Sequence, residues 1–288
     1  MIGNTSLKLL WLQDLDDYKP QAFAVKDLHL EHDKLLIHRT DSIFAESKST
    51  KVKDIEALRQ VVTRQQGSVK QALISSVNTD TNNQQLQELL NSLDIPTFFA
   101  QPSRQTGPLI NAYQAPEQLG VDRWLAMIAG LKFSPASAFG VIDLGSAITL
   151  DIIDAKAQHL GGHIVPGKAQ LTQILAQMGQ IRLDNSIKAN PEHALGKNTA
   201  ECVQLGCEQM VKSYLLSSLL EYQEKYQIKQ WFITGGGAVD WLKTLLVEGQ
   251  SVETGQMESF KVVIDQLTHV PDLNFYGLMQ LLKLLEQK

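Results

Sequence analysis

Residues 141–153 read VIDLGSAITLDII, two apolar runs separated by the pair Gly145-Ser146. Each run has the length and the β-branched content of a buried strand. A glycine followed by a small polar residue favours a tight turn. The stretch therefore predicts a strand at 138–143, a turn, and a returning strand at 147–153, with a third strand following at 159–165.

The rest of the chain can be divided around this turn. Before it, strands are predicted at 6–13, 22–30, 72–77 and 95–100, and helices at 53–64, 84–93 and 116–131. After it, helices are predicted at 168–180, 198–226, 235–247 and 273–285, and strands at 228–234 and 261–265. Alternating strands and helices predict an α/β protein with mixed sheets. The segment 133–137 is the predicted linker, which gives domains 1–134 and 135–288.

Composition excludes several classes of protein. The chain has 288 residues, 43% hydrophobic and 20% charged, with a net charge of −5 and no long basic run, which argues against a nucleic-acid partner. No apolar run approaches the roughly 18 residues that cross a bilayer, so no membrane partner is expected. The first five residues lack the features of a signal peptide, and the two cysteines are predicted to be reduced thiols. These features predict a cytoplasmic protein.

The first residues repeat the pattern of the decisive turn. Residues 2–8 (IGNTSLK) can be laid on 144–150 (LGSAITL), each with glycine and a small polar residue between strands. This repeat suggests two similar halves that face a cleft. Backbone N–H groups at the two turns could then hold the phosphates of a nucleotide from two sides. The alternative is that both are ordinary hairpin glycines.

Two further features accompany the turns. Asp143 ends the strand before Gly145, where a carboxylate can position a hard cation or can simply cap its own turn. Gly235-Gly236-Gly237 joins a predicted strand to a predicted helix, a junction that suits a base or a phosphate. It has neither the GxGxxG nor the Walker spacing, so it is a weak signal alone.

Gly120-Val121-Asp122-Arg123 places an acid and a base side by side in an otherwise apolar predicted helix. A carboxylate there can accept a proton from a substrate hydroxyl, and a guanidinium can bind a carboxylate or a phosphate. The alternative is a solvated helix face.

Taken in order, the motifs of the chain resemble those of the type III pantothenate kinases. The resemblance rests on GNT…K at 3–8, Tyr113-x-x-Pro116-x-x-Leu119-Gly120-x-Asp122-Arg123, Asp143-x-Gly145-Ser146-Ala147-x-Thr149-x-Asp151, Gly161-Gly162-x-Ile164-x-Pro166-Gly167, Gly196-x-Asn198-Thr199, Thr234-Gly235-Gly236 and Pro271-Asp272-Leu273…Gly277-Leu278. Each block is modest, but the ordered set spans essentially the whole chain.

The resemblance implies two ribonuclease H-like, actin-like ATPase domains that flank a nucleotide cleft. It implies ATP-dependent phosphorylation of pantothenate to 4'-phosphopantothenate, the first step of coenzyme A biosynthesis. A divalent cation such as Mg²⁺, a monovalent K⁺ or NH4⁺, and a homodimer are implied as well. The resemblance implies that Asp122 is the general base and that Asp143 is a ligand of the monovalent cation. The implied pantothenate contacts are Tyr113, Gly120, Val121, Asp122, Arg123 and Thr199. The implied ATP contacts are Gly3, Asn4, Thr5, Ser6, Lys8 and Ser146.

The sequence departs from the family pattern at two positions. Ser146 stands where the family usually has threonine, which keeps the hydroxyl, and Met1 stands where the first motif begins with aspartate. We expect from this second departure that the natural chain starts upstream of Met1. Two other functions stay open: a non-catalytic accessory or regulatory factor, and an actin-fold kinase for another small hydroxylated acceptor. The block from Tyr113 to Arg123 argues against the second.

Overall fold

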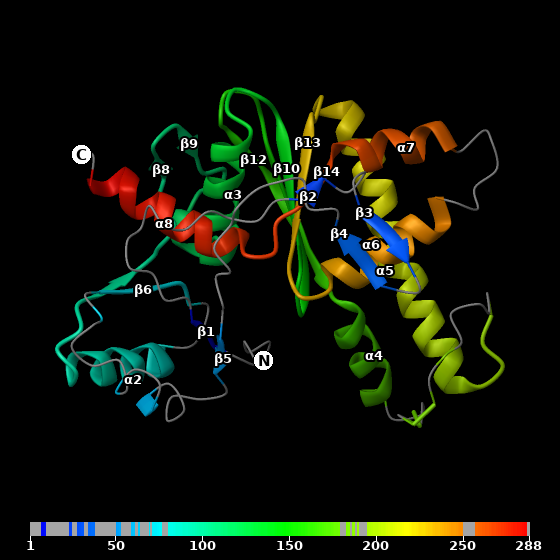
Figure 1. The fold of residues 1–288 in the computed structure, drawn as a ribbon, viewed down its shortest axis with the longest axis horizontal. Helices are drawn as coiled ribbons and strands as arrows, with labels where there is room; N and C mark the ends of the chain where they lie inside the picture. Colours follow the sequence, from blue (N-terminus) through cyan, green and yellow to red (C-terminus); the bar gives the residue numbers. More distant parts are fainter. Residues whose placement is uncertain are drawn as a thin grey trace.

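A six-stranded mixed sheet is the largest sheet among the described residues of this computed structural model (Figure 1). The structure describes residues 7–9, 23–24, 28–31, 34–37, 50–52, 59–60, 63, 69, 71–76, 80–178, 183–184, 186–187, 189, 195–249 and 257–286. In spatial order the strands are β12 (His159–Pro166), β11 (Ala147–Ile153), β10 (Phe139–Leu144), β13 (Gln230–Thr234), β14 (Leu267–His269) and β2 (Phe23–Ala24).

The strand directions confirm the predicted mixed α/β fold. β10, β11 and β12 form an antiparallel meander around the Gly145-Ser146 turn, with Asp143 opposite Thr149. β10, β13 and β14 are parallel, and β2 adds to β14 in the antiparallel sense. The sheet thus takes β2 from the first predicted domain and its other strands from the second. The boundary near 134 stays a prediction.

Helices cover both faces of this sheet (Figure 1). α3 (Val121–Phe133) and α8 (Leu273–Glu286) pack with Phe139, Val141 and Phe232 on one face. The helices on the other face, where Ile142 and Trp231 are buried, are α5 (Thr199–Lys225), α6 (Ala238–Gly249) and α7 (Met257–Gln266). Because side chains alternate along a strand, Asp143 shares the α3/α8 face with Val141.

The helix predicted at 116–131 is two elements in the structure. A 3₁₀ turn, η3 (Pro116–Gln118), ends at Leu119, and Gly120 is extended with φ −58° and ψ 132° before α3 begins. Glycine is a weak helix former, which accounts for a break at this residue. Asp122 and Arg123 therefore lie in the first turn of a helix rather than in its middle.

The strand predicted at 261–265 is wrong, because these residues belong to α7. Val263 is buried whereas its neighbour Val262 is 45% exposed, so one side of the segment faces the core and the other faces solvent, as in a surface helix. The adjacent β-branched residues Val262 and Val263 favoured a strand locally, but packing against α5 and α6 favours the helix. The strand β14 begins only at Leu267.

The first part of the chain contributes smaller units. α2 (Asp80–Asn91) packs on the parallel pair β6 (Ala72–Ile74) and β7 (Thr97–Phe99) through a small apolar cluster that includes Leu86 and Leu90. Three antiparallel pairs join β1 (Leu7–Leu9) with β5 (Thr50–Val52), β3 (Leu28–Glu31) with β4 (Lys34–Ile37), and β8 (Gln105–Thr106) with β9 (Leu109–Ile110). The first predicted turn, at 3–6, and Met1 lie outside the described residues.

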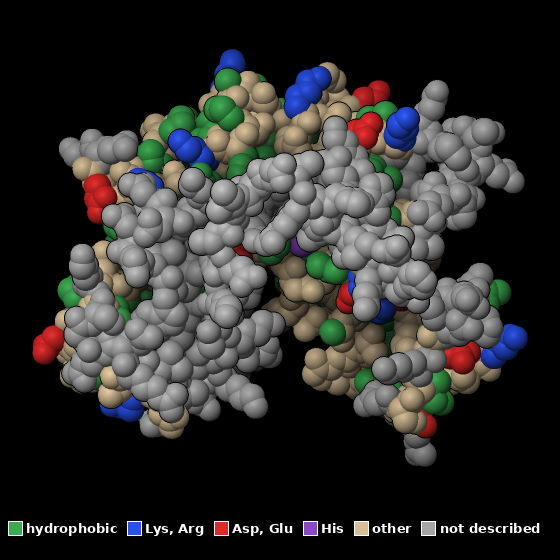
Figure 2. Space-filling model, viewed as in Figure 1, with side chains coloured by type: hydrophobic (Ala, Val, Ile, Leu, Met, Phe, Trp, Pro, Cys, Tyr) green, Lys and Arg blue, Asp and Glu red, His purple; other side chains and the backbone are tan. Residues whose placement is uncertain are grey.

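On the face drawn in Figure 2, the basic and acidic side chains of the described residues are interspersed rather than gathered in separate patches. Within the part of the chain that the structure describes, no helix is both long enough and apolar enough to span a bilayer.

Candidate active site

The first turn of α3 presents an acid beside a buried base. Asp122 is half-buried, and its Oδ1 accepts the backbone N–H of Arg123 at 2.8 Å. An acid in the first turn interacts favourably with the helix N-terminus. The Arg123 side chain turns inward and is almost fully buried. The solvated helix face considered for this motif is therefore excluded for Arg123.

Arg123 forms a bidentate pair with Asp151 of β11. Nε donates to Oδ2 at 2.8 Å and Nη2 donates to Oδ1 at 2.6 Å, between residues 28 positions apart in the chain. Burial alone raises the pKa of Asp151, but hydrogen bonds from His159 and Arg123 more than offset it and hold this pKa below its usual range. Burial acts to lower the pKa of Arg123, and the bonds to Asp151 and Tyr113 reverse that effect and raise it. Both groups are charged near neutral pH.

Tyr113 reaches the same guanidinium from a loop that is held at several points. Its hydroxyl accepts Arg123 Nη1 at 2.9 Å. Arg104 donates to the carbonyls of Tyr113, at 2.6 Å, and of Gln114, at 2.5 Å. The buried Asn111 accepts the backbone N–H of Tyr113 at 2.9 Å. The structure thus brings together two predicted substrate contacts, Tyr113 and Arg123, that are ten residues apart.

His159 completes this cluster, and sequence reasoning gave it no role. Its Nε2 lies 2.9 Å from Asp151 Oδ1, and its ring stacks at 6.3 Å on that of Tyr113. Sequence reasoning placed Asp151 in a family motif without a function. A charged residue in the apolar run AITLDII requires a buried partner. This pattern could have indicated from the sequence that Asp151 is paired. No comparable local signal marked His159.

Asp143 lies on the same face of the sheet as Asp151. Asp143 is opposite Thr149 in the register, and Asp151 is two residues further along the neighbouring strand. Such diagonal neighbours have Cα atoms about 7–8 Å apart. Asn274 at the start of α8 donates to Asp143 Oδ2 at 3.5 Å. Asp143, the candidate cation ligand, is therefore a diagonal cross-strand neighbour of Asp151, whose carboxylate binds Arg123.

Two of the three glycines after β13 pack against the end of β10, just before the Gly145-Ser146 turn. Gly237 donates its N–H to the carbonyl of Leu144 at 2.8 Å. Gly235 has φ +94°, and a Cβ there would clash with Asp143 Oδ1. Glycine is the residue that tolerates both conditions. The glycines at 235–237 and the second predicted phosphate turn thus lie together, and Ser146 in that turn is exposed.

The structure does not link Thr199 to this cluster through the described contacts. Thr199 is exposed in the first turn of α5, where Asn198 accepts the N–H of Glu201 at 3.0 Å. The buried residues of α5 pack on the face of the sheet opposite to α3. Its role in substrate binding stays a prediction. The predicted ATP contacts at 3–6 lie outside the described residues, and so does the side chain of Lys8.

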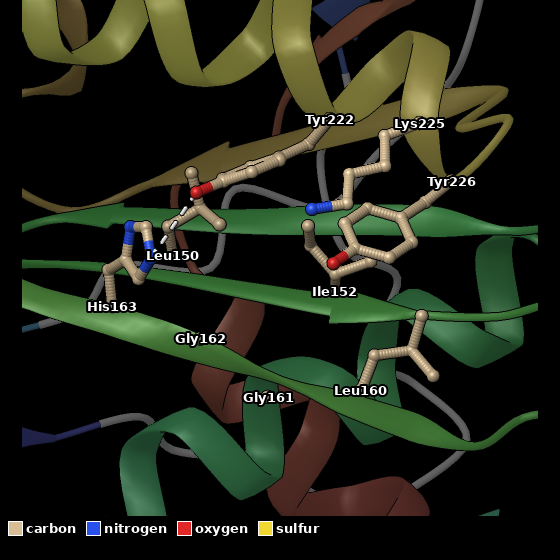
Figure 3. A pocket seen from close by; sticks show the side chains of 9 residues that line it. All are labelled: Leu150, Ile152, Leu160, Gly161, Gly162, His163, Tyr222, Lys225 and Tyr226. Carbon is tan, nitrogen blue, oxygen red and sulfur yellow. Dashed lines mark hydrogen bonds between the residues drawn. The ribbon is translucent and has the colours of Figure 1, made fainter.

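A shallow pocket of about 190 Å³ lies on that opposite face (Figure 3). Leu150 and Ile152 line it from the sheet, and Tyr222, Lys225 and Tyr226 line it from α5. None of the predicted site residues lines this pocket. In the described residues, no group of three His, Cys, Asp or Glu side chains is placed to hold a metal ion.

A sequence model of the type III pantothenate kinase family matches residues 2–216. The chain belongs to this family. A type III pantothenate kinase of Ectopseudomonas mendocina is 31% identical over 215 residues, which cover 73% of this chain and 79% of the relative. A type III pantothenate kinase of Pseudomonas fluorescens (strain Pf0-1) is 35% identical over 175 residues, 59% of this chain and 70% of the relative.

One solved structure supports the fold of this family member. A conserved Campylobacter jejuni protein named as a Baf family transcriptional activator superposes with a TM-score of 0.50. It covers 84% of this chain and 92% of its own, at 22% sequence identity. At that identity the likeness concerns the fold alone.

The glycine site of this kinase family member yields a stability prediction. Gly235→Ala is expected to lower the free energy of unfolding by more than about 1 kcal/mol, because alanine is strained at positive φ and its methyl group meets Asp143. Chemical denaturation measures the change. Gly236→Ala is the matched control, since its Cβ meets nothing within 4 Å. Equal stability of the two variants would contradict the packing described for Gly235.

Proposed function

We propose that this chain transfers the γ-phosphoryl group of ATP to the primary hydroxyl of pantothenate and forms 4'-phosphopantothenate. The observation that carries the proposal is the first turn of α3, where Asp122 stands beside an Arg123 already oriented by Asp151 and Tyr113. Asp122 would accept the proton of the attacking hydroxyl. Family membership supports both the reaction and the acceptor.

Arg123 has donors left for the acceptor. Three of its five N–H groups donate to Asp151 and Tyr113. The other two donate to none of the described residues. One of these lies on Nη1 and one on Nη2, and a carboxylate can accept from both. Pantothenate carries its carboxylate at the end remote from the primary hydroxyl. Binding there would hold the acceptor for attack, with Tyr113 and the backbone at 120–121 as further contacts.

ATP and a divalent cation such as Mg²⁺ would bind at the glycine turns. Backbone N–H groups around Gly145-Ser146 suit phosphate oxygens, and a Mg²⁺ ion bound with the nucleotide would offset phosphate charge while taking few ligands from the protein. The two turns of the repeat would hold the phosphates from both sides, in a cleft between two ribonuclease H-like domains. The residues at 3–6 are assigned to ATP by the family pattern.

A monovalent cation, K⁺ or NH4⁺, fits beside Asp143. Potassium takes oxygen ligands, and Asn274 Oδ1 is a buried oxygen with no hydrogen-bond partner among the described residues. Asn274 also contacts Asp143 through its amide nitrogen. Asp143 and Asn274 would therefore supply two of the oxygen ligands.

Asp143→Ala is expected to weaken activation by potassium more than it weakens pantothenate binding, because the variant loses a charged ligand of the cation. A potassium titration of turnover at saturating substrates, beside a pantothenate titration, measures the two effects. Asp184→Ala, which removes an exposed carboxylate bonded to Ser186, is the control. A potassium curve identical to that of the unmodified protein would remove Asp143 from the cation site.

We further propose that the protein is a homodimer. Exposed large apolar side chains occur on β12, on α4 (Lys168–Gln177) and on α5, and include Leu160, Ile164, Ile174 and Leu220. Such surfaces favour association. Light scattering after size exclusion tests this, and a mass of one chain would contradict it. A cytoplasmic location stays a prediction.

A coupled assay of ADP release tests the reaction itself. Turnover that requires pantothenate and rises with potassium is the expected result. Turnover with a sugar or with acetate, and none with pantothenate, would assign another acceptor. ATP binding without turnover of any acceptor would favour the accessory or regulatory role.

A further inference from the structure

The cluster around Arg123 is a closed ring of contacts, and two of its members, Asp151 and His159, take no direct part in the proposed chemistry. Arg123 binds Asp151 through two bonds, Asp151 contacts His159, and His159 stacks on Tyr113. Tyr113 then accepts from Arg123. Asp151, His159 and Arg123 are each 5% exposed or less. The ring joins the loop before η3, the first turn of α3 and two strands.

The contacts of His159 determine which ring nitrogen carries the hydrogen. The backbone N–H of Ala112 points at Nδ1 at 3.4 Å, so Nδ1 is the acceptor. Nε2 then carries the hydrogen and donates to Asp151 Oδ1 at 2.9 Å. Asp151 therefore accepts three hydrogen bonds, two from Arg123 and one from His159. Its carboxylate plane is fixed from both sides.

The backbone of β12 closes over the pair. A Cβ at Gly162 would lie 2.6 Å from Asp151 Oδ1 and 2.9 Å from Arg123 Nη2. Gly162 thus allows the strand to approach the pair closely, and no side chain separates them. The guanidinium has little room for a second rotamer.

We propose that His159 and Asp151 are positioning residues that set the plane of the Arg123 guanidinium, so that its two remaining N–H groups face the carboxylate of the acceptor. This inference rests on the proposed function, which makes Arg123 the carboxylate contact. A buried ion pair is a weak source of net stability, because desolvation offsets most of the attraction. The ring of contacts instead fixes the orientation of the Arg123 guanidinium, and bidentate recognition of a carboxylate depends on that orientation.

The test compares an acceptor that has the carboxylate with one that lacks it. The two acceptors are pantothenate and pantothenol, in which a hydroxymethyl group replaces the carboxylate. The variants are His159→Met, which removes the donor, and His159→Gln, whose amide nitrogen can replace Nε2. His163→Met is the matched control, because His163 lies on the same strand but bonds Tyr214 and Tyr222 on the other face.

His159→Met is expected to raise KM for pantothenate about tenfold, the order expected for a lost hydrogen bond to a charged group. Its kcat for pantothenate and its KM for pantothenol should change less than about twofold, well inside that scale. His159→Gln should restore most of the preference for pantothenate, and His163→Met should leave it unchanged. Equal changes for both acceptors, or no rescue by glutamine, would overturn the positioning role.

Calorimetric binding of pantothenate without ATP separates this inference from the proposed function. If His159→Met weakens pantothenate binding, His159→Gln restores it and His163→Met leaves it unchanged, but the chain does not phosphorylate pantothenate, the kinase proposal fails and the positioning role stands. If it phosphorylates pantothenate with the same KM in every variant, only the positioning role fails. A chain that neither binds nor phosphorylates pantothenate contradicts both.

Discussion

Replacing Asp122 with asparagine is expected to lower kcat for pantothenate about 10²–10⁴-fold, the usual effect of losing a general base. The fold should persist, because asparagine keeps an oxygen that can accept the N–H of Arg123 as Asp122 Oδ1 does. ATP binding should also persist, since the glycine turn is a separate part of the site. Steady-state ADP release measures kcat, and a fluorescent nucleotide measures ATP binding.

Glu117→Gln is the matched control for Asp122→Asn. Glu117 is an exposed acid on η3, a few residues before Asp122. Its amide variant should turn over like the unmodified protein. The assignment of Asp122 as base fails if Asp122→Asn keeps more than about a tenth of the turnover, far above the expected range.

Arg123→Met is expected to lower the free energy of unfolding by about 3–5 kcal/mol, because it leaves the buried carboxylate of Asp151 without its charged partner. Pantothenate turnover should be lost as well. The double variant Arg123→Met/Asp151→Leu should recover much of the stability, since apolar side chains replace both charges. It should not recover turnover. Urea denaturation and the kinase assay separate the two effects.

Lys168→Met is the control for the loss of an ion pair. Lys168 bonds Glu208 at 2.7 Å, but both side chains are more than 40% exposed. Breaking this pair should cost no more than about 1 kcal/mol. If Arg123→Met cost equally little, the Arg123–Asp151 pair would not be the buried element described above.

The same pair predicts how stability depends on pH. The pKa of Asp151 is lower in the folded protein than in the unfolded chain. Its contribution is therefore fully present above the unfolded value of about 3.9 and is lost as pH falls through the folded value. The double variant Arg123→Met/Asp151→Leu lacks this carboxylate, so its free energy of unfolding should lose the part of the acid dependence that comes from Asp151.

The sequence alone determined the elements around residues 141–153 and their order. The two apolar runs and the Gly145-Ser146 turn predicted β10 and β11, and both were confirmed. These signals are local, because the β preference of a short apolar run and the preferences of turn residues act within a few residues. The ordered motifs were also sufficient for the family, which the comparisons confirmed.

Predictions from local patterns failed at two places. The adjacent valines of α7 favoured a strand by propensity, yet one is buried and the other exposed on a helix. The segment 116–131 was predicted as one helix, yet it breaks at Gly120. In α7, contacts with α5 and α6 outweigh a strand preference of a fraction of a kcal/mol per residue, whereas at Gly120 the weak helix preference of glycine itself accounts for the break.

Only the tertiary structure decided which side chains form the site. Asp122 and Arg123 were singled out by type, but the pairing of Arg123 with Asp151 and the place of His159 were not. These contacts depend on the register of β10 with β11 and on how α3 lies on the sheet. A sequence pattern specifies the face of a helix or strand from which a side chain projects. Its partner on that face depends on how separate elements pack against each other.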